Sequence, residues 1–195
     1  MKHQAYIYYK LCSKGQQHHS AYHMEQRNVV DNILKEDLRK RFDVEFEQEN
    51  IVKGKYGKPY FKDMTQYHYN VSNTNGMVVC VISDIAVGVD TEKIKPFHMA
   101  VLKKSCNQKE QDYVLQTQDQ IEQAKRFMGL WTLKESYIKM IGQGLYFPLL
   151  EITFEQKADE IYASQEGFFT QRQVGEYWIS VCGKEELEVI WMEVS

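Results

Sequence analysis

The chain has 195 residues, of which 43% are hydrophobic, 13% aromatic and 26% charged, and its formal net charge is −3. This composition excludes a disordered chain, because it supplies enough apolar surface to bury a sizeable core. A slightly acidic chain has no global attraction to nucleic acid or to an anionic membrane, so we expect neither as a partner.

The cysteines indicate a cellular compartment. Cys12, Cys80, Cys106 and Cys182 show no Cys-x-x-Cys spacing, and two of them lie inside apolar runs. Free thiols of this kind favour a reducing, cytoplasmic setting. No stretch follows the pattern of a secretory signal peptide, and no apolar run approaches membrane-spanning length. The modest size of the chain favours a monomer.

The first half of the chain predicts a strand, a helix and several further strands. Tyr and Ile residues predict a strand at Ala5–Leu11, and apolar residues at three- and four-residue steps predict a helix from Ser20 to Phe42. Further strands are predicted at Val44–Val52, Tyr67–Ser72 and Met77–Ile82. The last of these is continuously apolar, so we expect it to be buried on both faces. A turn at Ser83-Asp84 is then expected to complete a hairpin with a strand at Ala86–Asp90.

A basic loop lies within this half, at Lys53–Lys62. It carries four lysines around two glycines and a proline, with no acidic residue before Lys62. Such a loop can hold a phosphate, or it can be a solvated turn, and the segment alone leaves both possibilities open.

The second half begins with helices and ends with strands. Helices are predicted at His98–Leu115 and Asp119–Ile141. Strands are predicted at Leu149–Phe154, Glu160–Ser164, Phe168–Val174, Tyr177–Cys182 and Leu187–Met192. Two halves of similar length and mixed content predict an α/β lobe at 1–97 and another at 98–195, with a site in the cleft between them.

Two carboxylates follow one another closely in Val87–Lys93. In an extended strand Gly88, Asp90 and Glu92 share one face. Paired carboxylates suit Mg²⁺ or Mn²⁺, and Gly88 would leave room for phosphates. On this spacing alone the metal site is weakly supported, because acidic residues at the end of a strand usually lie on a solvated edge.

A second acid and a lysine lie four residues apart in the second predicted helix. Glu135 and Lys139 share a helix face at the edge of its apolar stripe. Taken alone, the pair fits an ordinary surface ion pair best.

Three segments together resemble the signature of the 4′-phosphopantetheinyl transferases, specifically the single-chain type that is typified by the surfactin-synthetase-activating enzyme. The resemblance runs from about Arg27 to Pro148. Its segments are Gly57-Lys58-Pro59 with Asn70-Val71-Ser72-Asn73-Thr74, then Gly88-Val89-Asp90-Thr91-Glu92-Lys93, then Trp131-Thr132-Leu133-Lys134-Glu135-Ser136-Tyr137-Ile138-Lys139 with Gly142-Gln143-Gly144-Leu145.

This resemblance implies an α+β fold of two similar lobes related by pseudo-twofold symmetry. It also implies a Mg²⁺-dependent enzyme of the holo-[acyl-carrier-protein] synthase type. Such an enzyme moves phosphopantetheine from coenzyme A to a serine of an apo acyl or peptidyl carrier domain, and releases adenosine 3′,5′-bisphosphate. The carriers serve nonribosomal peptide, polyketide or fatty-acid synthesis, and the residues do not say which one is served.

The resemblance further implies roles for single residues. Glu135 would act as general base and Lys139 would neutralise charge on the pyrophosphate. The implied metal ligands are Asp90, Glu92 and Glu135, and the implied coenzyme A contacts are Arg27, Lys58, Ser72, Asn73, Lys134 and Lys139. Trp131 would support the site, and Glu110 matches a family acid whose role varies.

One position departs from the family pattern. Asn73 stands where the family usually has a histidine that contacts the 3′-phosphate of coenzyme A. An asparagine donates a hydrogen bond but cannot become cationic. We therefore expect looser binding of coenzyme A, or tolerance of 3′-dephospho-coenzyme A.

Two other functions compete with the transferase. The first is a non-catalytic module on the same fold that binds carrier domains or nucleotides, although the intact set of acids disfavours it. The second is another Mg²⁺-dependent phosphotransferase or hydrolase, which the absence of a Gly-x-x-x-x-Gly-Lys-Ser/Thr loop disfavours.

Overall fold

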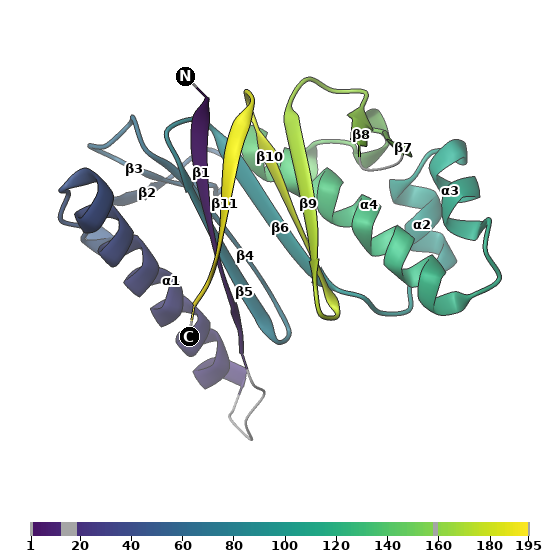
Figure 1. Cartoon of the computed structure of the whole chain (residues 1–195), viewed down its shortest axis with the longest axis horizontal. Helices are drawn as coiled ribbons and strands as arrows, with labels where there is room; N and C mark the ends of the chain where they lie inside the picture. The colour runs from purple at the N-terminus through teal and green to yellow at the C-terminus, as the bar shows by residue number, and fades with distance from the viewer. Residues whose placement is uncertain (1, 13–18, 158–159, 195) are drawn as a thin grey trace.

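The computed structural model describes residues 2–12, 19–157 and 160–194 (Figure 1). Within these ranges the α-helices are α1 (His19–Phe42), α2 (Met99–Ser105), α3 (Gln108–Leu115) and α4 (Gln120–Ile141). The strands are β1 (His3–Leu11), β2 (Ile51–Lys53), β3 (Pro59–Phe61), β4 (His68–Thr74), β5 (Met77–Ser83), β6 (Val87–Lys93), β7 (Phe154–Lys157), β8 (Glu160–Ala163), β9 (Phe168–Val174), β10 (Tyr177–Gly183) and β11 (Leu187–Glu193).

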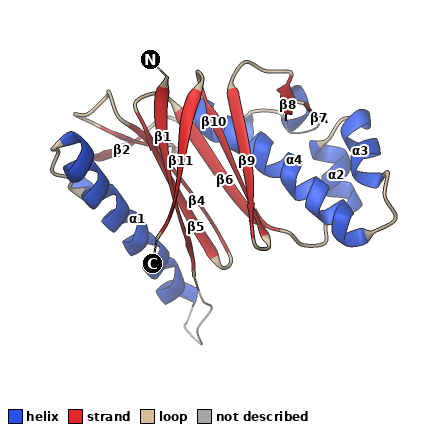
Figure 2. Cartoon of the chain, viewed as in Figure 1, coloured by secondary structure: helices blue, strands red, loops and turns tan. Residues whose placement is uncertain are grey.

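The long helices and the two larger sheets form four layers (Figure 2). One sheet has the strand order β11-β1-β5-β4 and the other has the order β6-β10-β9. Alternate residues of β5 point to opposite faces, so Val78 packs with Leu34 of α1, whereas Val79 packs with Ile179 of β10 between the sheets. The prediction that this strand is buried on both faces is confirmed.

The far face of the second sheet is covered by α4. Leu133 and Ile138 of α4 pack in a third core cluster with Cys182 of β10. Because each sheet therefore has one face on a helix and one on the other sheet, three apolar clusters hold the four layers together.

The two halves of the chain repeat one pattern of pairing. In the first half, β1 and β4 both pair antiparallel with β5. In the second half, β6 and β9 both pair antiparallel with β10. Each half thus consists of a strand, a long helix and a hairpin whose second strand returns beside the first. The α+β fold class expected from the resemblance is confirmed.

Strand pairing also crosses the lobe boundary that was predicted at residue 97. β6 lies in the sheet of the second half, and β11 pairs in parallel with β1. The division into 1–97 and 98–195 stays a prediction, and these two strands tie its parts together.

The predicted hairpin between Met77–Ile82 and Ala86–Asp90 is wrong. Both edges of β5 are occupied, by β1 and by β4, so β6 pairs with β10 instead. A short turn between two apolar runs predicts a hairpin locally, but it cannot reveal that the first strand already has two partners.

Three other boundaries differ because polar residues interrupt apolar runs. At Val44–Val52, Glu47 and Asn50 form a capping box around a 3₁₀ turn, and only the end of the segment is strand. The predicted helix His98–Leu115 is two helices, since Asn107 caps the start of α3. The predicted strand Leu149–Phe154 begins as a 3₁₀ turn, and β7 starts only at its last residue.

Two expectations about the interior can be compared with the described residues. The four cysteines Cys12, Cys80, Cys106 and Cys182 are free and buried. Of the helices that the structure describes, none combines the length and the apolar character needed to cross a membrane.

Gly88 marks the closest approach between β6 and α4. A Cβ atom at this position would lie 2.1 Å from the carbonyl oxygen of Ser136 and 2.3 Å from the amide nitrogen of Met140. These are backbone atoms, so they cannot move aside as a flexible side chain would. Gly88 therefore makes room for α4, and not for the phosphates expected from the sequence.

We predict that Gly88→Ala destabilises the protein by roughly 1–3 kcal/mol or more, because the added methyl group must separate β6 from α4. Urea denaturation would measure the loss. Gly129→Ala is the matched control, because its Cβ would meet nothing closer than 3.5 Å. In a helix interior the control should gain about 0.5–1 kcal/mol. Equal stability of Gly88→Ala and the wild type would contradict the close approach.

Candidate active site

The predicted acid of β6 lies where three elements meet. Asp90 on β6 accepts hydrogen bonds at Oδ1 from Lys139 Nζ of α4 at 2.6 Å and from Ser72 Oγ of β4 at 2.8 Å. Lys139 Nζ also donates to Ser72 Oγ at 2.8 Å. A carboxylate, a hydroxyl and an ammonium group thus close a triangle at the seam between the two sheets.

The backbone of β6 explains how this cluster forms. Val87 and Val89 enter the apolar cluster between the sheets, so the alternating residues Gly88, Asp90 and Glu92 share the other face. This face is the one that α4 covers, and Lys139 lies on α4 one turn after Glu135. The predicted sharing of one strand face is confirmed.

Burial and mutual repulsion perturb the acids of the cluster. Asp90 is only 5% exposed, and burial raises its pKa, although the charge and hydrogen bond of Lys139 oppose this effect. Burial also raises the pKa of Glu135, and the negative charges of Asp90 and Glu92 raise it further. The negative charges of neighbouring acids therefore disfavour the ionisation of Asp90 and of Glu135.

The donor set fits a hard divalent cation in charge and chemistry. Asp90 Oδ2 is buried and has no hydrogen-bond partner among the described residues. Glu92 is half-buried, and its Oε2 accepts from Thr74 Oγ1 and Lys95 Nζ, both at 3.2 Å. A cation would satisfy the orphaned oxygen and relieve the repulsion between the acids. In the part of the chain that the structure describes, no three His, Cys, Asp or Glu side chains converge as a ready metal-binding group.

Lys58 of the basic loop lies against the backbone of the site. Its Nζ donates to the carbonyl oxygens of Val87 at 3.0 Å and Met140 at 2.9 Å. Burial lowers the pKa of Lys58 to about 8. The side chain therefore joins the start of β6 to the end of α4, and in this structure its donors are directed to peptide groups.

Lys134 lies on the inner side of α4, with 0% of its surface exposed. Its Nζ donates to Glu110 Oε2 at 2.8 Å and to two carbonyl oxygens, those of Ile152 at 2.7 Å and Leu149 at 3.1 Å. Glu110 accepts in addition from the amides of Asn107 and Phe154. Since both charges are buried and hydrogen-bonded, the pair of Lys134 and Glu110 stabilises the interior behind the site.

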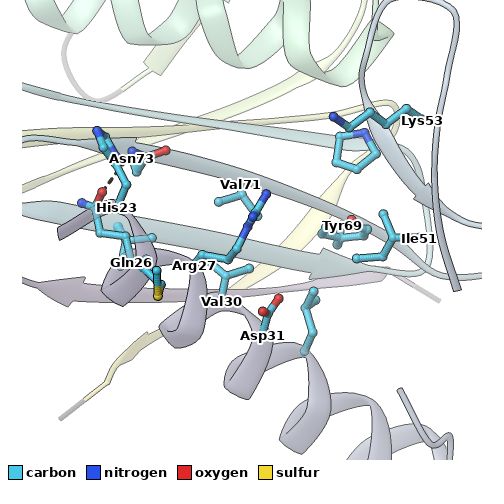
Figure 3. Close-up of a pocket in the computed structure, with 14 residues that line it drawn as sticks. His23, Gln26, Arg27, Val30, Asp31, Ile51, Lys53, Tyr69, Val71 and Asn73 are labelled. Carbon is cyan, nitrogen blue, oxygen red and sulfur yellow. Dashed lines mark hydrogen bonds between the residues drawn. The ribbon is translucent and has the colours of Figure 1, made fainter. Parts of the chain in front are cut away.

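Arg27 and Asn73 line a cavity of about 620 Å³ between α1 and the outer face of β4 (Figure 3). His23 and Lys53 also line it, so the cavity carries basic groups above an apolar floor of residues such as Val71. Because side chains alternate along β4, Asn73 faces this cavity whereas Ser72 faces Asp90. One strand thus serves two parts of the site.

The sequence did not single out Gln26, although it organises the wall of this cavity. Gln26 is buried on α1, its Nε2 donates to the carbonyl oxygens of Thr74 and Met77, and its Oε1 accepts from Asn73 Nδ2 at 3.1 Å. A glutamine close to the apolar stripe of a helix was the available signal. Trp131, predicted to support the site, is half-buried beside Phe127, with ring centroids 6.0 Å apart.

Comparison with known proteins identifies the family. The model of the 4′-phosphopantetheinyl transferase superfamily matches residues 86–183, which run from the start of β6 to the end of β10. The 4′-phosphopantetheinyl transferase gsp of Aneurinibacillus migulanus is 35% identical over 143 residues, covering 70% of this chain and 59% of that protein. The transferase Sfp of Bacillus subtilis is 30% identical over 131 residues, covering 66% and 58%. The chain belongs to the 4′-phosphopantetheinyl transferase superfamily.

The matches cover only part of each relative. The chain spans a little under three fifths of the length of these two relatives, 59% and 58%. Family and fold are established on this basis, whereas the activity, substrates and partners of this chain are proposals.

The electrostatics of Glu135 generate a prediction. Because the native state raises the pKa of this acid above its ordinary value of 4.5, ionisation costs folding free energy, and stability should fall as pH rises from 4.5 to 7. We predict that Glu135→Gln is more stable than the wild type at pH 7 without divalent cations and depends less on pH. With Mg²⁺ added, the wild type should gain more stability than the variant.

Urea unfolding between pH 4.5 and 7, with and without Mg²⁺, would measure both effects. Glu49→Gln, at an exposed acid far along the chain from the cluster, controls for the loss of one charge. Identical pH slopes for the wild type and Glu135→Gln would show that the fold does not raise the pKa of Glu135.

Proposed function

We propose that the protein transfers 4′-phosphopantetheine from coenzyme A to a serine of an apo acyl or peptidyl carrier domain, leaving adenosine 3′,5′-bisphosphate. The observation that carries this proposal is the cluster of Asp90, Ser72 and Lys139 beside Glu135, at a seam of a fold that belongs to this superfamily. The two relatives, each named as a 4′-phosphopantetheinyl transferase, support the same reaction.

The reaction makes two demands on the residues of the site. A bond forms between the serine oxygen and the β-phosphorus of coenzyme A, and the bond from that phosphorus to the bridging oxygen breaks. The serine proton needs an acceptor, and negative charge on the pyrophosphate needs neutralisation. The leaving group departs with the bridging oxygen as a phosphate oxygen.

Glu135 is the proposed proton acceptor. Burial and the neighbouring acids raise its pKa, which makes the carboxylate a stronger base near neutral pH than an exposed glutamate. Lys139, one helical turn away, is the proposed electrostatic partner of the pyrophosphate. Its ammonium group already joins Asp90 and Ser72 across the seam, so it is held in place before substrate arrives.

Asp90, Glu92 and Glu135 are the residues that would hold Mg²⁺ or Mn²⁺. Bound there, the cation would supply further charge neutralisation on the pyrophosphate oxygens. The buried oxygen Asp90 Oδ2, which has no hydrogen-bond partner among the described residues, supports this assignment.

Coenzyme A is proposed to extend from this cluster into the cavity of Arg27 and Asn73. The basic groups of that cavity support phosphate binding, and its apolar floor supports contact with the adenosine. Ser72, whose hydroxyl faces Asp90 and Lys139 in the cluster, is a proposed phosphate contact. Lys58 donates two of its three ammonium hydrogens to backbone carbonyls, which leaves one for a phosphate, and Lys134 supports the helix from behind.

The partner is proposed to be a carrier domain of nonribosomal peptide, polyketide or fatty-acid synthesis, modified in the cytoplasm by a monomeric enzyme. A non-catalytic module that only binds carriers or nucleotides is the alternative. The two functions differ in turnover, so one experiment separates them.

We predict that the protein, incubated with coenzyme A, Mg²⁺ and a panel of apo carrier domains, adds one phosphopantetheine to at least one carrier. Intact-mass measurement of the carrier reads out the transfer. Glu135→Ala should slow it by at least about 100-fold, the lower range for loss of a general base. Glu49→Ala should leave it unchanged, because Glu49 is exposed outside the site.

Coenzyme A binding without mass gain on any carrier would favour the non-catalytic module. Mass gain that survives Glu135→Ala would reject the proposed base while leaving the transferase intact. Chelation by EDTA, followed by return of Mg²⁺ or Mn²⁺, compares the two cations directly.

Asn73 generates a prediction about substrate preference. A charge-assisted hydrogen bond contributes roughly 1.5–3 kcal/mol, against about 1 kcal/mol for a neutral one. We therefore predict that Asn73→His raises the preference for coenzyme A over 3′-dephospho-coenzyme A by about 3- to 30-fold in kcat/KM. Asn73→Ala serves as the control for simple loss of the Gln26 contact. An unchanged preference in Asn73→His would contradict the assignment.

A further inference from the structure

Two edge strands meet at the site without forming a continuous sheet. Among the described residues, β4 is the last strand of the first sheet and pairs only with β5, and β6 is the first strand of the second sheet and pairs only with β10. On an unpaired edge, alternate backbone amides have no strand partner. In a buried seam these amides need another acceptor.

Two side chains of β4 supply the missing acceptors. Asn70 Oδ1 accepts from the amide of Val89 at 2.9 Å, and Ser72 Oγ accepts from the amide of Thr91 at 3.3 Å. Both bonds are buried, and the two residues that flank Asp90 on β6 are the ones held. The side chains of β4 therefore replace a backbone ladder on either side of the acid.

We propose that Asn70 is a positioning residue, whose side-chain carbonyl holds β6 at the distance from β4 that lets Ser72 and Lys139 both reach Asp90. The inference rests on the proposed function for its consequence in catalysis, but the contact itself does not depend on that function. The roles proposed for Asp90, Ser72 and Lys139 do not include Asn70.

The distances explain why this single bond matters. Ser72 Oγ is shared among the amide of Thr91, Lys139 and Asp90, and its bond to the amide is the longer of the two that hold β6. Asn70 is 5% exposed, and its bond is the shorter. Without the acceptor, the buried amide of Val89 would lose its hydrogen bond, and moving β6 away from β4 would be the route to solvate it.

The residue type fits this role. An asparagine offers a neutral carbonyl oxygen, whereas an aspartate would place a further negative charge beside acids that already repel one another. A valine or threonine on β4 would have no acceptor of the same reach. The asparagine at position 70 is therefore explained by its hydrogen bond with the amide of Val89 on the neighbouring strand.

The test compares Asn70→Ala with Val81→Ala. Val81 is the Cα partner of Asn70 on β5 and is fully buried, so its truncation destabilises the same region without removing the acceptor. Mn²⁺ binding to each protein is measured by calorimetry and electron paramagnetic resonance without coenzyme A or carrier. Amide hydrogen exchange at Val89 is measured in the same proteins.

We expect Asn70→Ala to weaken Mn²⁺ binding by at least about 10-fold and to accelerate exchange at Val89, whereas Val81→Ala changes neither beyond its loss of global stability. In transfer assays kcat should fall by about 10-fold or more, with KM for coenzyme A within about twofold, because the coenzyme cavity lies on the other face of β4. Asn70→Asp keeps an acceptor at the same reach, and a bound dication offsets its added negative charge, so it should retain Mn²⁺ binding.

Equal effects of Asn70→Ala and Val81→Ala on Mn²⁺ binding and on Val89 exchange would overturn the proposal. So would a loss of Mn²⁺ binding in folded Asn70→Asp that matches the loss in Asn70→Ala. If Asn70→Ala does not fold, the comparison of Asn70→Asp with the wild type still decides. Mn²⁺ binding and amide exchange at Val89 need no transfer activity. Failure of the proposed reaction is therefore distinguished from failure of this inference.

Discussion

The bond between Lys139 and Asp90 is the interaction on which the rest of the site depends. A buried carboxylate is costly unless a cation and hydrogen bonds compensate its charge, and here the cation comes from a different element than the acid. The pair can form only if α4 lies directly on β6. That approach needs a glycine at position 88, where even a methyl group would collide with the helix backbone. The electrostatics of the candidate site therefore depend on the packing of α4 against β6.

Three lysines of the family signature make different use of their charge. Lys139 faces the acids of the seam, Lys134 neutralises a buried acid behind the same helix, and Lys58 binds carbonyl groups at the end of that helix. Together they anchor α4 from three directions. Lys58 and Lys134 thus stabilise the helix that carries Glu135 and Lys139.

The sequence predicted the elements whose side chains follow a simple period. Alternation along β6 was enough to place its acids on one face, and the apolar run of β5 was enough to predict burial on both faces. Prediction was poorer where short-range polar bonds intervene, as at Asn107, which splits one expected helix into two. It was poorest for pairing, because the hairpin pattern between β5 and β6 carries no information about the strands that already flank β5. Gln26 and the role of Asn70 were missed for the same reason, since the partners of both side chains lie on other elements.

The sequence by itself determined the family signature, the chemical types of the site residues and most of the strands and helices, because these depend on residue identity and local spacing. Only the tertiary structure decided which of those residues meet. Asp90, Ser72 and Lys139 are separated by 18 residues or more along the chain, and their contact follows from the stacking of two sheets and the close approach of α4. Burial decided what each charged group does. The same group destabilises the fold, stabilises it or serves chemistry at a site, according to how much water and how many partners surround it.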